Sequence, residues 1–156
     1  ASSYGELAHR LLGGMLERHW GRIINVSSVA GLTPPSAGHT FYGPTKSFLV
    51  SFTQALAAEC DGSGIHVSAL CPGFTYTEFH DVTGTREQVD SLPGFLMMQV
   101  GETVEGALKA VEKNHTVYVP GLQYKFLVLL SNILPRSWVE HLVKGPSKNY
   151  RNTRSE

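Results

Sequence analysis

The chain has 156 residues, of which 42% are hydrophobic and 17% are charged. This composition is too apolar for a disordered chain, and the length is that of one globular domain. Lysine and arginine together number 13, as do aspartate and glutamate. The chain therefore lacks the basic excess that is typical of a nucleic-acid-binding protein, and we expect no nucleic-acid partner.

Cysteine usage and apolar runs limit the class of protein further. Cys60 and Cys71 are too few for a disulfide framework, so we expect a reduced, cytoplasmic protein. Polar residues interrupt the first 14 positions, which argues against a signal peptide there. No apolar run approaches the length of a membrane-spanning helix.

Elements in the first half of the chain alternate in type. Helical spacing of apolar residues predicts a helix over residues 4–20, and the apolar run Arg22–Val26 predicts a buried strand. After a loop rich in glycine and proline, a second helix is predicted over residues 41–59, with Pro44 in its first turn. The faces that we expect to be buried carry Leu7, Leu11, Leu12 and Met15 in the first helix and Phe48, Phe52, Ala55 and Leu56 in the second.

The alternation continues in the second half. The runs Ile65–Leu70 and Thr116–Val119 predict two further strands. Between them, residues 75–100 predict one or two short helices, and residues 102–113 predict an amphipathic helix with Gly101 as its N-cap. The expected buried face of that helix carries Val104, Ala107, Leu108 and Val111. Residues 122–142 are predicted to be a helix broken at Pro135.

Strands that alternate with helices predict an α/β fold, with right-handed crossovers and a Rossmann-like, doubly wound parallel sheet. Three strands are few for such a sheet, and the glycine-rich turn that binds phosphates near the start of such folds does not occur here. Either this is an unusually small α/β protein, or the N-terminal part of the fold is missing from this sequence.

Three groups of polar residues are predicted where a parallel α/β sheet has its ligand crevice. Asn25–Ser28 closes the first strand, Tyr42–Lys46 opens the second helix, and Cys71–Thr77 follows the second strand. A helix places Tyr42 and Lys46 within one turn on one face. An ammonium nearby favours the phenolate form of a tyrosine, which equips it for proton transfer at neutral pH.

These groups suit the interconversion of a carbonyl and an alcohol. Tyr42 can give or take the hydroxyl proton, Ser28 can polarise the same oxygen, and the hydride must come from a cofactor. A Tyr-x-x-x-Lys pattern alone is more often a structural pair on a helix surface. The combination with the other two groups favours the catalytic interpretation.

The sequence resembles the short-chain dehydrogenase/reductase family in Gly21–Gly31, in Tyr42–Lys46 and in Pro72-Gly73 with Thr77. The resemblance implies an NAD- or NADP-dependent oxidoreductase in which Ser28 orients the substrate and Tyr42 is the acid/base. Lys46 would tune Tyr42 and bind the nicotinamide ribose. The loop that contains Pro72, Gly73, Thr75 and Thr77 would hold the nicotinamide. Of the two adjacent serines, the family's spacing to the tyrosine favours Ser28 over Ser27.

The resemblance also bears on organisation and partners. It implies that residues 1–144 are the C-terminal part of a single NAD(P)-binding domain, followed by a polar tail over residues 145–156. Helices 4–20 and 42–59 correspond to those that pair in relatives, so a homo-oligomer is expected. The alternative is a non-catalytic remnant or interaction protein that pairs through these two helices. A glycine-rich strand–turn–helix encoded upstream would favour the enzyme.

Other features leave two interpretations open. Phe95–Met98 could cover an apolar carbonyl or alcohol substrate, or could simply pack in the core. The run Tyr124–Leu134 could contact a membrane surface, although docking onto the domain is the favoured interpretation. The histidines do not have the spacing of a metal site, so no metal is expected.

Overall fold

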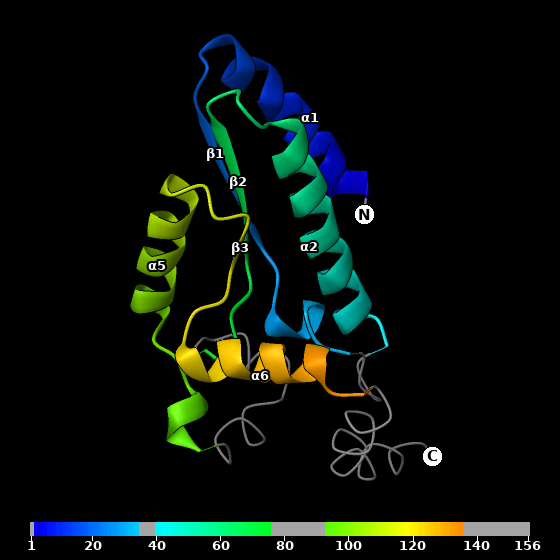
Figure 1. Cartoon of the computed structure of the whole chain (residues 1–156). Coiled ribbons are helices and arrows are strands. Elements are labelled where there is room, and N and C mark those ends of the chain that lie inside the picture. The colour runs from blue at the N-terminus through cyan, green and yellow to red at the C-terminus, as the bar shows by residue number, and fades with distance from the viewer. Residues whose placement is uncertain (1, 35–39, 76–92, 136–156) are drawn as a thin grey trace, which may run out of the picture.

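A computed structural model describes residues 2–34, 40–75 and 93–135 (Figure 1). The elements in chain order are α1 (Ser2–Glu17), β1 (Gly21–Val26), the 3-10 helix η1 (Val29–Gly31), α2 (Tyr42–Glu59), β2 (Ile65–Leu70), the 3-10 helix η2 (Gly94–Leu96), α5 (Val100–Glu112), β3 (Val117–Tyr118) and α6 (Leu122–Ile133). This order confirms the predicted alternation of helices and strands.

The three strands form a parallel sheet in the order β1-β2-β3. Strand β1 pairs with β2 along its full length, from Gly21 opposite Ile65 to Val26 opposite Leu70. Strand β3 adds only Val117 and Tyr118, which lie opposite the end of β2. The α/β class and the parallel sheet are therefore as predicted. The carboxyl ends of all three strands therefore lie at the same edge of the sheet.

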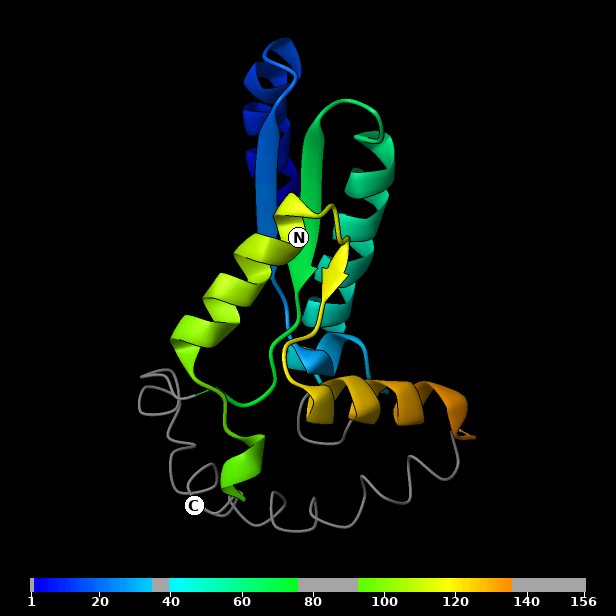
Figure 2. The same ribbon diagram turned by 60° about the vertical axis from the view of Figure 1, so that its left-hand side comes forward.

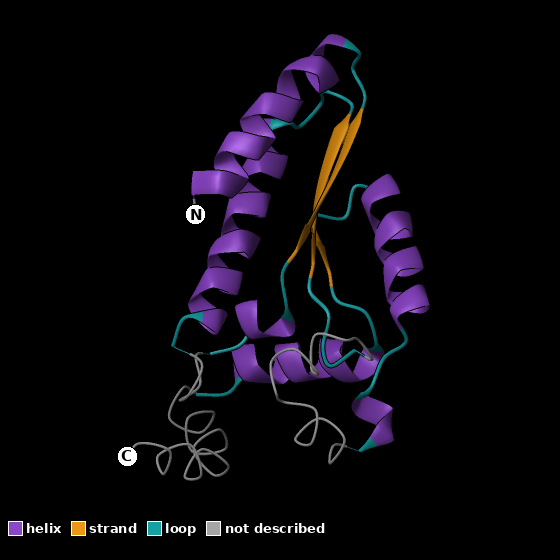
Figure 3. Ribbon diagram, turned by 180° about the vertical axis from the view of Figure 1, so that it is seen from behind, coloured by secondary structure: helices purple, strands orange, loops and turns teal. Residues whose placement is uncertain are grey.

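The helices cover both faces and one end of this sheet. Figure 1 and the reverse view in Figure 3 show α1 and α2 side by side on one face and α5 on the other. Figure 2 shows α6 lying across the carboxyl ends of the strands. In the part of the chain that the structure describes, no helix combines the length and the apolar character needed to cross a bilayer.

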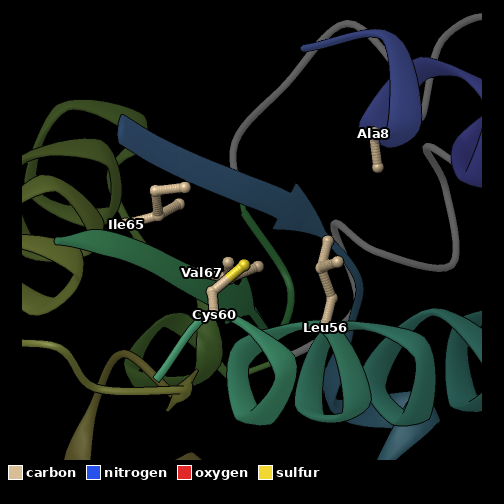
Figure 4. Packing of buried hydrophobic residues seen from close by; sticks show 5 residues of the cluster. All are labelled: Ala8, Leu56, Cys60, Ile65 and Val67. Carbon is tan, nitrogen blue, oxygen red and sulfur yellow. The ribbon is translucent and has the colours of Figure 1, made fainter. Parts of the chain in front are cut away.

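The main core lies between the sheet and the helices α1 and α2. Ala8 of α1, Leu56 of α2 and Val67 of β2 are buried together in it (Figure 4). Cys60 and Ile65 extend the same cluster at the end of α2 and the start of β2. A second cluster of Val50, Ala69 and Cys71 lies nearer the carboxyl ends of the strands. Contact of α2 with both clusters fixes the helix that carries Tyr42 and Lys46.

The predicted buried faces of two helices are partly wrong. In α2 the buried residues are Gly43, Leu49, Val50, Thr53 and Leu56. Phe48, which was expected to be buried, is 41% exposed and stacks on Phe52 instead, and Ala55 is also exposed. In α1 the buried residue is Ala8, whereas Leu7 and Leu11 are 57% and 47% exposed. The predicted residues Leu12 and Met15 of α1 and Phe52 of α2 are partly buried and pack against the main core.

Helix α5 also differs from its predicted face and start. Its buried residues are Thr103, Ala107, Ala110 and Val111, whereas Val104 and Leu108 are 47% and 54% exposed. Small side chains let α5 lie closer to β1 and β2 than the larger apolar residues would. The prediction of Gly101 as N-cap is wrong, because α5 begins at Val100 after Gln99. Helix α6 ends at Ile133, before the predicted break at Pro135.

Candidate active site

The residues that follow β1 and β2 meet at the carboxyl edge of the sheet. The backbone N–H of Ser27 donates to Leu70 O at 2.7 Å, and that of Val29 donates to Pro72 O at 3.0 Å. These two bonds continue the pairing of the strands past their ends. The loop after β1 and the loop after β2 are therefore held side by side, as the predicted ligand crevice requires.

Ser28 is buried at the start of η1, with 8% of its surface exposed. Its hydroxyl caps this short helix by accepting a hydrogen bond from Ala30 N at 3.2 Å. The same hydroxyl lies 3.5 Å from Pro72 O. Ser28 thus lies where the loop after β1 meets the loop after β2, and the backbone groups of Ala30 and Pro72 set its rotamer.

Tyr42 and Lys46 lie one turn apart at the start of α2. Pro44 is the third residue of this helix, where the missing N–H costs no helical hydrogen bond. The ammonium of Lys46 lies 5.8 Å from the centroid of the Tyr42 ring and donates to Val26 O at 2.9 Å. Tyr42 is 42% exposed. The helix therefore brings a half-exposed phenol and a tethered cation together, as the spacing predicted.

Burial shifts the pKa values of Lys46 and of the neighbouring Cys71. It lowers the pKa of Lys46, and the charge of the neighbouring Cys71 acts in the opposite direction. Burial also raises the pKa of the Cys71 thiol to about 11, although hydrogen bonds from Ser27 and Ser28 and the nearby Lys46 oppose this shift. At neutral pH the Cys71 thiol is therefore protonated.

Ser27 and Gly31 hold Lys46 in place, and sequence reasoning missed both roles. The Ser27 hydroxyl donates to Lys46 O at 2.8 Å, and Ser27 is only 3% exposed. A Cβ added at Gly31 would lie 2.7 Å from the backbone C and O of Lys46, so η1 approaches α2 where only glycine fits. The signal in the sequence was the first serine of the pair Ser27-Ser28 and the glycine three residues after Ser28.

The loop after β2 is anchored from α6. Pro72 accepts the bond from Val29 described above, and the hydroxyl of Thr75 donates to Gly73 O at 3.2 Å. Thr75 also forms an isolated parallel bridge with Met98. The Phe74 backbone N–H donates to the hydroxyl of Tyr124 at 2.9 Å. Thr77 lies outside the described residues.

These donors suit the ribose and nicotinamide of a dinucleotide. An ammonium offers three N–H donors, of which Lys46 directs one to Val26 O at 2.9 Å. The Tyr42 phenol lies beside it. Lys46 contacts η1, and the N-cap of η1, Ser28, lies against Pro72 at the carboxyl edge of the parallel sheet. The residues present therefore fit that end of the cofactor. A glycine-rich turn for the pyrophosphate is absent from this sequence.

Metal-binding side chains do not gather near this site. Nδ1 of His66 lies 2.9 Å from Val111 O, on the α5 side of the sheet. Over residues 2–34, 40–75 and 93–135, no three His, Cys, Asp or Glu side chains come close enough to hold a metal ion. His39 and His80 lie outside these ranges.

Comparisons with known proteins agree with this arrangement. The sequence model of the family described as short chain dehydrogenase matches residues 2–88. Nodulation protein G of Azospirillum brasilense is 36% identical over 127 residues, which are 77% of this chain and 49% of that protein. The 3-oxoacyl-[acyl-carrier-protein] reductase FabG of Pseudomonas aeruginosa is 38% identical over 99 residues, which are 64% of this chain and 38% of that protein.

Solved structures give the same relationship. A short-chain dehydrogenase from Sphingobium yanoikuyae, in complex with NADPH, superposes with a TM-score of 0.69 and 27% sequence identity. The match covers 100% of this chain and 57% of that one. The chain matches half or less of the length of Nodulation protein G and of the Pseudomonas aeruginosa reductase. The family match over more than half of this chain, together with the parallel sheet, shows that the chain belongs to the short-chain dehydrogenase family.

Proposed function

We propose that these residues form the catalytic part of an NAD(P)-dependent oxidoreductase that interconverts a carbonyl compound and an alcohol. The observation that carries the proposal is the pairing of Tyr42 with Lys46, whose ammonium lies 5.8 Å from the centroid of the Tyr42 ring. This pair stands at the carboxyl edge of the sheet, where parallel α/β folds bind their ligands. The family to which the chain belongs consists of oxidoreductases.

Tyr42 is proposed as the acid/base. In the reducing direction its hydroxyl gives a proton to the substrate oxygen as the carbonyl carbon gains a hydride. In the oxidising direction the phenolate takes that proton back. The Lys46 ammonium stabilises the phenolate, and its bond to Val26 O at 2.9 Å keeps it beside the ring. Ser28, fixed as the cap of η1, would orient the substrate oxygen.

A nicotinamide cofactor, when bound, supplies or accepts the hydride. Lys46 and Tyr42 are proposed to bind its ribose. The loop that contains Pro72, Gly73, Thr75 and Thr77 is proposed to hold the nicotinamide. NADPH is present in the related structure from Sphingobium yanoikuyae, which supports NAD(P) as the class of cofactor. An assay of carbonyl reduction should therefore include NADH and NADPH separately.

The proposed substrate is a small carbonyl or alcohol compound with an apolar portion. Aromatic side chains in the segments around the site are exposed: Phe41 is 86% exposed, Phe74 is 43% exposed and Phe95 is 69% exposed. Phe41 directly precedes Tyr42, and Phe74 lies in the Pro72–Thr75 loop, so both are available to contact an apolar portion of a substrate. The relative from Pseudomonas aeruginosa acts on a 3-oxoacyl chain according to its name, which is compatible with this class.

The second candidate is an interaction protein that pairs through α1 and α2. Leu7, Leu11 and Leu16 of α1 are 57%, 47% and 47% exposed, which leaves an apolar surface next to α2. Such a surface is typical of an interface between protein chains. A homo-oligomer formed through the same two helices is also compatible with the enzyme, so pairing alone does not separate the two candidates.

Cofactor-dependent turnover separates them. The complete encoded protein is mixed with NADH or NADPH and with either acetoacetyl-CoA or a bulky aromatic ketone, and loss of reduced nicotinamide is followed by absorbance. Oxidation of the cofactor that depends on the ketone supports the enzyme. If neither cofactor changes its fluorescence on titration and no ketone is reduced, the oxidoreductase is contradicted and the interaction protein is favoured.

A further inference from the structure

Tyr124 is the buried residue of α6, most of whose other residues are exposed. Only 2% of its surface is exposed, whereas its neighbours Leu122 and Phe126 in α6 are 81% and 62% exposed. Helix α6 lies across the carboxyl ends of the strands (Figure 2). Tyr124 therefore attaches α6 to the edge of the sheet where the candidate active site lies.

The hydroxyl of Tyr124 bridges two backbone segments that are far apart in sequence. It accepts a hydrogen bond from Phe74 N at 2.9 Å and donates one to Leu96 O at 2.7 Å. The backbone N–H of Met98 donates to Phe74 O at 3.0 Å and joins the same two segments. Phe74 is thus held through both its N–H and its C=O. Because both partners of Tyr124 are backbone groups, they define the path of the chain and not only a side-chain position.

The ring of Tyr124 fixes the residue that precedes Phe74. A Cβ added at Gly73 would overlap the Tyr124 ring, so the ring lies directly on the Gly73 backbone. Gly73 does not have a positive φ. The need for glycine at position 73 therefore comes from contact with Tyr124 and not from the backbone conformation.

We propose that Tyr124 is a positioning residue that sets the Pro72–Thr75 loop against α6 and thereby sets where the nicotinamide is held. This inference rests on the proposed function in one respect, namely that this loop holds the nicotinamide. Tyr124 acts through the loop backbone. Burial raises the pKa of Tyr124, so its hydroxyl keeps the proton that it donates to Leu96 O.

The first test replaces Tyr124 by phenylalanine in the complete encoded protein. Tyr124→Phe keeps the ring on Gly73 but removes both hydrogen bonds of the hydroxyl. We expect the Kd for NADH or NADPH to rise by about tenfold, because the Phe74 N–H loses its partner and the loop loses its fixed position. In the same variant, hydrogen exchange of the Phe74 amide should become faster by a similar factor.

The matched control is Tyr118→Phe. Tyr118 is a half-buried tyrosine in β3, and its hydroxyl lies against Gly106 of α5 and not against the loop. A general loss of stability would affect both variants. If the cofactor Kd and the exchange of the Phe74 amide change in Tyr124→Phe but not in Tyr118→Phe, the result supports the positioning role of Tyr124.

A double-mutant cycle tests the contact with the ring. Gly73→Ala should weaken cofactor binding in the wild-type background, because its methyl group meets the Tyr124 ring. In a Tyr124→Leu background the same substitution should weaken cofactor binding less, because the smaller leucine leaves room for the methyl group. Equal effects in the two backgrounds would contradict the steric part of the proposal.

The outcomes distinguish this inference from the proposed function. If wild-type protein binds the cofactor and Tyr124→Phe changes neither the Kd nor the Phe74 exchange, the positioning role is wrong and the proposed function stands. If wild-type protein binds neither NADH nor NADPH, the proposed function is contradicted, and with it the nicotinamide role of the loop.

Discussion

The side chain of Ser27 is hydrogen-bonded to the backbone oxygen of Lys46 at 2.8 Å, which ties the end of β1 to the first turns of α2. Lys46 reaches back across the same junction, because its ammonium donates to Val26 O at 2.9 Å. The strand and the helix are therefore linked in both directions beside the proposed catalytic pair, Tyr42 and Lys46. The position of Lys46 depends on this junction and not on the helix alone.

Ser27→Ala is expected to lower the free energy of unfolding by about 1 kcal/mol, because it removes a buried hydrogen bond. Chemical denaturation measures this change. Ser51→Ala is the control. Ser51 is an exposed residue of α2, and loss of its hydroxyl should change the free energy of unfolding by less than about 0.5 kcal/mol. Equal effects of the two substitutions would show that the Ser27 bond is not stabilising.

Gly31→Ala is expected to destabilise the protein by about 1–3 kcal/mol, because the new Cβ would lie 2.7 Å from the backbone of Lys46. Neither backbone can move without separating η1 from α2. Gly13→Ala is the matched control, because a Cβ at Gly13 of α1 meets no atom within 4 Å. The control should stabilise the helix by roughly 0.5–1 kcal/mol. Thermal unfolding of the two variants should therefore shift in opposite directions.

Stability should fall as the pH rises from about 9 to about 11, in part because of Cys71. The folded thiol has a pKa of about 11, raised by burial from an ordinary value of 9.0. Between these values the unfolded chain loses the proton first, so the folded state binds more protons and deprotonation favours unfolding. The loss for this group is roughly 2 kcal/mol. Lys46 contributes with the opposite sign, because burial lowers its pKa.

Comparison of wild type with Cys71→Ala isolates this contribution. Denaturation midpoints are measured between pH 8 and pH 11, and the alkaline decline should be shallower in the variant. Cys60→Ala measures the contribution of the other buried thiol, whose pKa is also raised by burial and which should act in the same direction. A decline that is equally steep with and without Cys71 would assign the alkaline transition to other groups.

Lys46→Met should reduce turnover by about a hundredfold, because the phenolate of the proposed acid/base loses its stabilising charge. Lys109→Met is the control. Lys109 is an exposed residue of α5 that pairs with Glu105, and an exposed pair contributes little. A turnover in Lys46→Met that matches the control would remove Lys46 from the proposed mechanism.

The sequence predicted the positions of the strands and the proximity of Tyr42 to Lys46 well, for local reasons. Strand β2 is observed over the predicted residues Ile65–Leu70, because a short apolar run bounded by turn residues leaves few alternatives. The spacing of Tyr42 and Lys46 needs only one helical turn to bring them together. These features depend on neighbouring residues, so a single sequence contains the information.

Contacts between distant segments could not be predicted in the same way. In α5 the predicted Ala107 and Val111 are buried, but Val104 and Leu108 are exposed and Thr103 and Ala110 are buried in their place. For the apolar run Tyr124–Leu134, docking onto the domain was favoured over contact with a membrane surface, but the run did not indicate which residue makes the contact. Phe74, the hydrogen-bond partner of Tyr124, lies 50 residues earlier in the chain. No local pattern encodes that pairing, because it arises only when α6 crosses the carboxyl ends of the strands.

The most direct test of the catalytic assignment is the turnover of Tyr42→Phe in the complete encoded protein, measured beside Tyr4→Phe. Tyr4 and Tyr42 are both 42% exposed, so the two substitutions remove a hydroxyl from equally accessible rings. We predict that Tyr42→Phe loses ketone reduction by about a hundredfold or more with cofactor binding largely retained, whereas Tyr4→Phe keeps both. Turnover in Tyr42→Phe equal to that of Tyr4→Phe would contradict the role of Tyr42 as the acid/base.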